Sequence, residues 1–147
     1  MMAERPFLPY PIGGFDEDPE SLIEFRGLTP RPKADGFGRQ RALVAIAIFQ
    51  LNNSRRRGEL FEDRARQIVT LYLALQGREQ GSSARMVRQS EKLVRYYTSD
   101  RAPHANCLRS FHRLYQSDRP AAENIFRLAA KLLGSYVGSH EQAATDR

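Results

Sequence analysis

The side chains whose type and spacing suggest chemistry in this sequence are basic, and the chemistry they suggest is the binding of phosphate. Arg55, Arg56 and Arg57 are consecutive and precede a glycine, which indicates a turn. Arginines in a turn point in different directions, and this suits contact with a phosphate backbone, which needs no fixed geometry. The alternative is a solvated loop, partly neutralised by the nearby Glu59 and Glu62. We refer to Arg55, Arg56 and Arg57 as the arginine triplet.

A second basic group occupies one face of the helix that is expected between Ser83 and Thr98. At about 100° per residue, four cations fall within an arc of about 80°; they are Arg85, Arg88, Lys92 and Arg95. Same-sign charges three and four residues apart cost a helix about 0.2–0.5 kcal/mol per pair, so a polyanion that offsets the repulsion is expected. The alternatives are a solvated face and pairing with acidic residues of the same chain. We call these four residues the basic stripe.

The opposite face of this helix is apolar and is expected to pack on the core. It spans an arc of about 120° and comprises Met86, Val87, Ser90, Leu93, Val94 and Tyr97. Tyr96 falls beside the basic stripe, where its ring is expected to stack on a base. The sequence therefore predicts contacts with nucleic acid through Arg55, Arg56, Arg57, Arg85, Arg88, Lys92, Arg95 and Tyr96.

Residues that could carry catalysis or bind a metal are few. His104, Cys107 and His112 share one expected helix, but zinc is usually held by four ligands from two separated pairs, and the sequence has no second pair. The sequence also lacks the phosphate-loop, dinucleotide-binding, nucleophile-elbow and zinc-peptidase motifs. It therefore predicts no enzymatic activity, no metal and no cofactor, with Cys107 as a thiol in the core.

The N-terminal quarter differs from the rest of the chain in composition. Residues 1–36 contain six of the eight prolines and seven acidic residues against four basic ones, whereas the whole chain carries a net charge of +6. This segment is expected to be an extended, polyproline-like arm. A short helix over residues 18–25, capped by Asp18 and opened by Pro19, would interrupt it before a linker.

Apolar side chains on this arm are expected to bind a protein. They are Phe7, Leu8, Tyr10, Phe15, Leu22, Ile23 and Phe25. If the bound protein is a neighbouring copy, the chain is a self-assembling coat or packaging subunit that holds nucleic acid. The alternative is a small adaptor or regulatory protein that binds a different protein through the arm.

The remainder of the chain predicts an all-α fold, a compact bundle of about five helices. Hydrophobic periodicity places them at about 39–53, 59–76, 83–98, 103–116 and 120–137. The first is apolar nearly all round and is expected to be central and buried. Gly77 is expected to end the second helix. The expected organisation is an arm and linker over 1–37, a basic helical domain over 38–138 and a flexible tail over 139–147.

The cellular location of the protein is predicted from features that the sequence lacks. It has one cysteine, and its N-terminus lacks the apolar core of a signal peptide. Its longest apolar run, Ala42 to Phe49, is too short to span a bilayer. The sequence therefore predicts an intracellular protein, or one packed inside a viral particle, without a membrane span.

Overall fold

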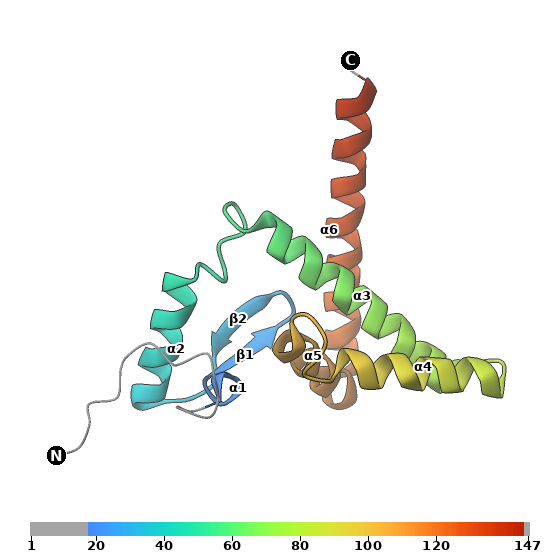
Figure 1. Ribbon diagram of the computed structural model, residues 1–147, viewed down its shortest axis with the longest axis horizontal. Coiled ribbons are helices and arrows are strands. Elements are labelled where there is room, and N and C mark those ends of the chain that lie inside the picture. Colours follow the sequence, from blue (N-terminus) through green and yellow to red (C-terminus); the bar gives the residue numbers. More distant parts are fainter. Residues whose placement is uncertain (1–17, 146–147) are drawn as a thin grey trace.

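The computed structural model describes residues 18–145, with side chains as far as Gly134. The described chain forms six helices and one two-stranded antiparallel sheet (Figure 1). The prediction of a mainly helical fold is confirmed, and a small β-hairpin over residues 23–32, which was not predicted, is present beside the helices. Phe7, Leu8, Tyr10 and Phe15, which were expected to bind a protein, lie outside the described residues.

Five of the six helices correspond to the five predicted for the bundle, and α1 corresponds to the start of the short helix predicted over residues 18–25. In chain order the elements are α1 (Pro19–Leu22), β1 (Ile23–Arg26), β2 (Thr29–Pro32), α2 (Gly36–Ile48), α3 (Gly58–Gln80), α4 (Ala84–Tyr97), α5 (Ala105–Ser117) and α6 (Arg119–Thr145). Helix α3 runs through the middle of the molecule, and α4 folds back beside it (Figure 1). Helix α6 crosses α3 and extends beyond it, while α2 lies at the other end, next to the hairpin.

The main hydrophobic core is built around α3, because this helix contacts α4, α5 and α6. Its large buried side chains are Ile68, Leu71 and Leu75 from α3, Leu108, Phe111 and Tyr115 from α5, and Val94 from α4. A smaller second cluster joins Leu22 and Ile23 to the inner face of α2. The body of the molecule is therefore one core with a smaller core at the α2 end.

The hairpin replaces the end of the helix that was predicted over residues 18–25. Asp18 caps α1 as expected, because its Oδ1 accepts a hydrogen bond of 3.0 Å from the Glu20 N–H. The helix ends at Leu22, and the β-branched Ile23 opens a strand that suits such residues. Gly27, at a φ of 62°, fills the first position of the two-residue turn, which favours glycine.

Burial of the hairpin corrects part of the predicted protein-binding surface. Leu22 and Ile23 are buried in the chain's own core, so they are not available on the surface as was expected. Phe25 is half-buried and lies under the guanidinium of Arg64, 4.9 Å from its ring centre. These apolar side chains hold the hairpin on the body instead.

Helix α2 is peripheral, which corrects the prediction of a central buried helix. Within it only Arg41, Ala42, Ala45 and Ile46 are buried. The helix ends at Ile48 and not at residue 53 because Gln50 adopts a left-handed φ of 50°. The N–H of Leu51 then reaches the carbonyl of Ile46, which is the hydrogen bond of a Schellman ending.

Gly77 does not end α3, contrary to the prediction. The helix continues for three more residues to Gln80. A Cβ at position 77 would collide with Ser90 Oγ of α4. The glycine therefore serves close packing between α3 and α4 and not helix termination. Helix α6 likewise continues through Gly138 to Thr145, where a flexible tail was predicted.

Candidate nucleic-acid interface

Helix α4 presents the basic stripe, and its position follows from a cap and one packed face. Ser83 caps the helix, since its Oγ accepts a hydrogen bond of 3.2 Å from the Met86 N–H. Ser90 and Val94 are the two buried residues, and both face inward at helical spacing. The contact with Gly77 brings the two helices close together. The orientation of α4 about its own axis is thereby fixed.

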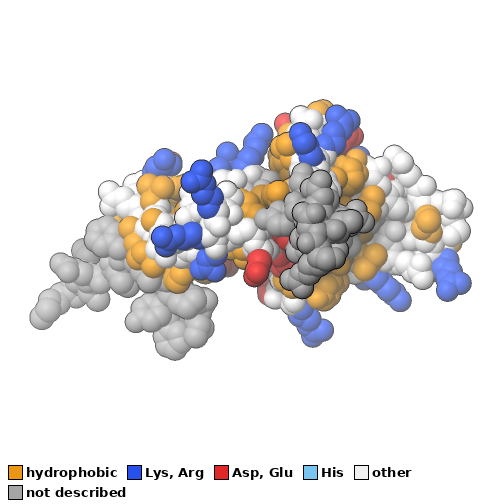
Figure 2. Space-filling view, turned by 90° about the horizontal axis from the view of Figure 1, so that it is seen from above, with side chains coloured by type: hydrophobic (Ala, Val, Ile, Leu, Met, Phe, Trp, Pro, Cys, Tyr) orange, Lys and Arg blue, Asp and Glu red, His pale blue; other side chains and the backbone are white. Residues whose placement is uncertain are grey.

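This orientation leaves the basic stripe on the outer side of α4. All four side chains, Arg85, Arg88, Lys92 and Arg95, are exposed. Figure 2 shows Lys and Arg side chains projecting from the end of the molecule that the α3–α4 hairpin forms. Within the described part of the chain, none of the four makes an ion pair. Even Glu91, one turn before Arg95 on the same helix, is not paired with it.

Tyr96 is exposed beside the stripe, as its position on the helix predicted. Its ring meets the ring of Tyr97 edge to face, with centres 5.2 Å apart and planes at 75°. Tyr97 itself is half-buried and packs against the core. The Tyr96 ring is therefore supported from one side, while 45% of the residue remains open to solvent.

Two further exposed residues on α4 were expected in the core. Met86 is 48% exposed and Leu93 is 44% exposed, although the periodicity placed both on the packed face. The reason is that α3 covers only the centre of that face, where Ser90 and Val94 lie. Met86 and Leu93 fall on the flank that borders Tyr96 and is left uncovered.

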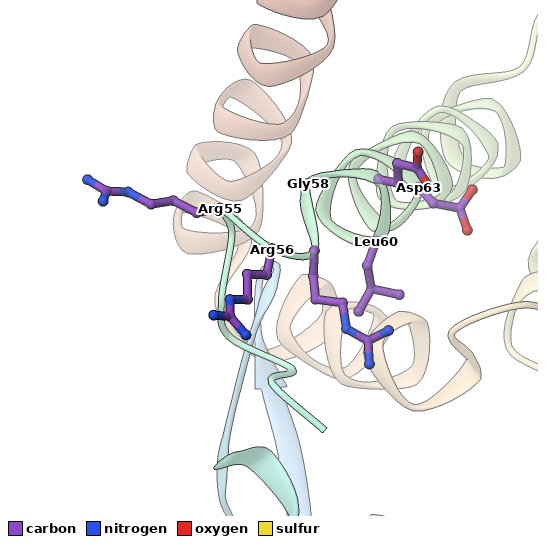
Figure 3. Close-up of a pocket in the computed structure, with 7 residues that line it drawn as sticks. Arg55, Arg56, Gly58, Leu60 and Asp63 are labelled. Atoms are coloured by element: carbon purple, nitrogen blue, oxygen red, sulfur yellow. The ribbon is translucent and has the colours of Figure 1, made fainter. Parts of the chain in front are cut away.

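The arginine triplet lies at the other end of α3, in the turn that precedes Gly58. It lines an open hollow of about 840 Å³ together with Gly58, Glu59, Leu60 and Asp63 (Figure 3). In Figure 3 the side chains of Arg55 and Asp63 point to opposite sides of the hollow. Arg57 is partly committed to the loop, because its Nη2 donates a hydrogen bond of 3.0 Å to the Phe49 carbonyl.

The structure does not bring the triplet and the stripe together. The triplet precedes α3, and the stripe is on the helix that follows it. Helix α3 has 23 residues, so its axis is about 34 Å long. In Figure 3 the side chains of Arg55 and Arg56 point in different directions. The triplet therefore forms a cationic region separate from the stripe.

Of the three groups considered for catalysis or metal binding, Cys107 and His104 make contacts within the fold. Burial raises the pKa of the Cys107 thiol to about 12, so it does not form a thiolate near neutral pH. The thiol donates to the Gly27 carbonyl at 3.3 Å. His104 Nε2 lies 2.7 Å from Asp63 Oδ2, which joins α3 to the start of α5. Burial also lowers the pKa of His112.

No metal centre or membrane helix is found in the described part of the chain. Its His, Cys, Asp and Glu side chains form no group of three that could hold a metal ion. None of its helices is long and apolar enough to cross a bilayer. Comparison of the chain with protein-family models, with curated proteins and with solved structures finds no match.

Proposed function

We propose that this protein binds nucleic acid through the phosphate backbone, with the basic stripe of α4 as the main contact. The observation that carries the proposal is a row of four exposed cations that have no carboxylate partner in the described chain. Repulsion between these four cations destabilises the helix, and bound phosphate groups would offset this repulsion.

The form of the row favours a polymer over a single anion. Arg95 is ten positions after Arg85, which corresponds to about 15 Å along the helix axis. One exposed ion pair contributes little in water, but several phosphate contacts on one strand release several counterions together. A strand with regularly spaced phosphates therefore suits this surface better than an isolated phosphate does.

The test is the salt dependence of nucleic-acid binding by a variant in which all four stripe residues are replaced by alanine. Each lost phosphate contact should reduce the slope of log K against log salt by about 0.7–0.9, so the slope should fall by about 3. A matched control replaces Arg26, Lys33, Arg39 and Arg127 by alanine. These are also three arginines and one lysine, exposed and without an ion pair in the described chain.

The control removes the same charge from other surfaces, so it should leave most of the slope in place. If both variants change the slope equally, net charge and not the stripe drives binding. If the stripe variant keeps the slope of the wild-type protein, the proposed site is wrong.

A separate observation favours a second function, the association of copies of this chain as a self-assembling subunit. Helix α2 exposes Leu43 and Ile48, and its C-cap residue Phe49 is exposed as well, with 59% of Ile48 open to solvent. Several large apolar side chains exposed on one short segment suit an interface with another copy. Sedimentation of a Leu43→Glu/Ile48→Glu variant tests this, because an assembly held by α2 should dissociate.

Deleting residues 1–17 then separates the two uses of the arm. Loss of self-association with nucleic-acid binding retained would support a coat or packaging subunit. A protein that stays monomeric in every case, and loses a different partner on deletion, would support an adaptor instead.

A further inference from the structure

A strip of exposed side chains borders the basic stripe along α4. At about 100° per residue, the order around the helix from the stripe towards α3 is Tyr96, Gln89, Leu93 and Met86. All four are exposed. The helix thus shows three zones: cations on the outside, an aromatic and apolar strip on one flank, and the face that packs on α3.

The strip and the stripe are in immediate contact on the helix surface. Lys92 and Leu93 lie four and three residues before Tyr96, which are the spacings that make neighbours on a helix. Tyr96 therefore stands at the border between a cation and an apolar side chain. Its edge-to-face contact with Tyr97 holds the ring upright at this border.

We propose that α4 binds single-stranded nucleic acid, with the phosphates on the basic stripe and the unpaired bases on Tyr96, Leu93 and Met86. This inference rests on the proposed function and specifies its substrate class. A single strand presents charged phosphates beside exposed base faces, and aromatic side chains stack on any base. A duplex keeps its bases stacked inside, so it would cover the cations and leave the apolar strip in water.

An anionic membrane is the rival partner for a basic amphipathic helix, and the packing of α4 argues against it. A helix that lies in a membrane interface buries its whole apolar face in the lipid. In α4 the centre of that face is already buried against α3 through Ser90 and Val94. Of that face, the flank with Met86 and Leu93 remains exposed, so the helix cannot bury its whole apolar face in lipid without leaving α3.

The experiment measures binding by fluorescence anisotropy with two labelled probes at one salt concentration. One is an oligothymidine of about 12 nucleotides, within the usual site size for single-strand binders, and the other is a duplex of the same length. The wild-type protein should bind the single strand at least tenfold more tightly. The Tyr96→Ala variant should lose about fivefold or more on the single strand and less than twofold on the duplex.

Two variants separate stacking from loss of structure. Tyr96→Phe keeps the ring, so it should bind within about twofold of the wild-type protein. Leu128→Ala removes an exposed leucine of α6, on another surface, and should change neither affinity. Because stacking involves no counterions, Tyr96→Ala should also leave the salt slope unchanged, which distinguishes it from the stripe variant.

The outcomes distinguish this inference from the function on which it rests. If neither probe binds in a salt-dependent way, the proposed function fails. If the duplex binds as tightly as the single strand, or Tyr96→Ala weakens both equally, the protein binds nucleic acid but this inference is wrong. If vesicles of anionic lipid bind in a Tyr96-dependent way and the oligonucleotides do not, both are wrong.

Discussion

Two arginines that join separate elements, Arg109 of α5 and Arg119 of α6, are matched by carboxylates, whereas the cations on the outer side of α4 are not matched within the described chain. Arg119 Nη1 and Nη2 each lie 3.0 Å from a carboxylate oxygen of Glu79. Arg109 pairs with both oxygens of Glu20 and with Asp100. The stripe has no such partner within the described chain. The molecule therefore contains two kinds of cation, although both lie near solvent.

The difference shows which cations hold the fold. Arg119 reaches a residue 40 positions away, and Arg109 reaches one 89 positions away, so each joins separate elements. Each also donates to a backbone carbonyl, Arg119 to Tyr115 and Arg109 to Thr98. Among the described residues, the stripe side chains form no ion pair that joins two elements.

The largest effect is expected at Arg64, a buried arginine that joins elements through backbone carbonyls. Its Nη1 donates to the carbonyls of Leu28 and Leu51, at 3.0 and 2.9 Å, and so joins the hairpin and the α2–α3 loop to α3. Arg64→Met would leave both carbonyls without this donor. We expect a loss of about 3 kcal/mol in the free energy of unfolding, measured with urea. A loss under about 1 kcal/mol would show that the hairpin is held by packing alone.

A smaller loss is expected at Arg109, which is paired but partly exposed. It links Glu20 of α1 to the end of α4 through the Thr98 carbonyl. Arg109→Ala should reduce the free energy of unfolding by about 1–2 kcal/mol, because charge-assisted hydrogen bonds are lost near the surface. The comparison of paired and unpaired cations would be wrong if this variant were as stable as one that lacks a stripe arginine.

The Glu79–Arg119 pair should make the stability of the fold depend on pH. The hydrogen bond from Arg119 holds the pKa of Glu79 below its usual range. The pKa of Glu79 is therefore lower in the folded protein than in the unfolded chain, where it is near 4.5. The stabilisation by the pair is fully present above the unfolded pKa and is lost as the pH falls through the folded pKa. Thermal unfolding of Glu79→Gln should therefore depend less on pH than that of the wild-type protein below about pH 4.5. Parallel curves would contradict this.

The smallest change in stability is expected where the largest change in binding is proposed. Replacing the four stripe residues by alanine removes repulsion between Arg85, Arg88, Lys92 and Arg95 and gains helix propensity. The free energy of unfolding should therefore stay the same or rise by roughly a few tenths of a kcal/mol. A clear loss of stability would mean that these side chains serve the fold.

The sequence predicted α4 well because its signals are local. Ser83 caps the helix, and the cations and apolar residues separate at helical period. What periodicity could not show is how much of the apolar face the neighbouring helix covers. Met86 and Leu93 were therefore placed in the core, and the strip beside the stripe was missed.

Other errors arose where tertiary contacts override local signals. Gly77 looks like a helix ending, but it allows Ser90 to approach. Gln50 ends α2 in a left-handed conformation that usually calls for glycine or asparagine. The hairpin was interpreted as helix and linker because Pro30 and Pro32 mask a strand, although prolines are tolerated on an edge strand. Asn106 and Ser110 of α5, 83 and 85 positions away, anchor β1, and no local pattern reports them.

The most direct measurement is the ratio of absorbance at 260 and 280 nm of the protein purified from cells at low and at high salt. The chain has no tryptophan and six tyrosines, so its own absorbance at 280 nm is weak and bound nucleic acid is easily seen. We expect a high ratio at low salt that falls to the protein value at high salt, and a low ratio throughout for the stripe variant. A wild-type ratio that is low at every salt concentration, or a stripe variant that retains the nucleic acid, would contradict the account.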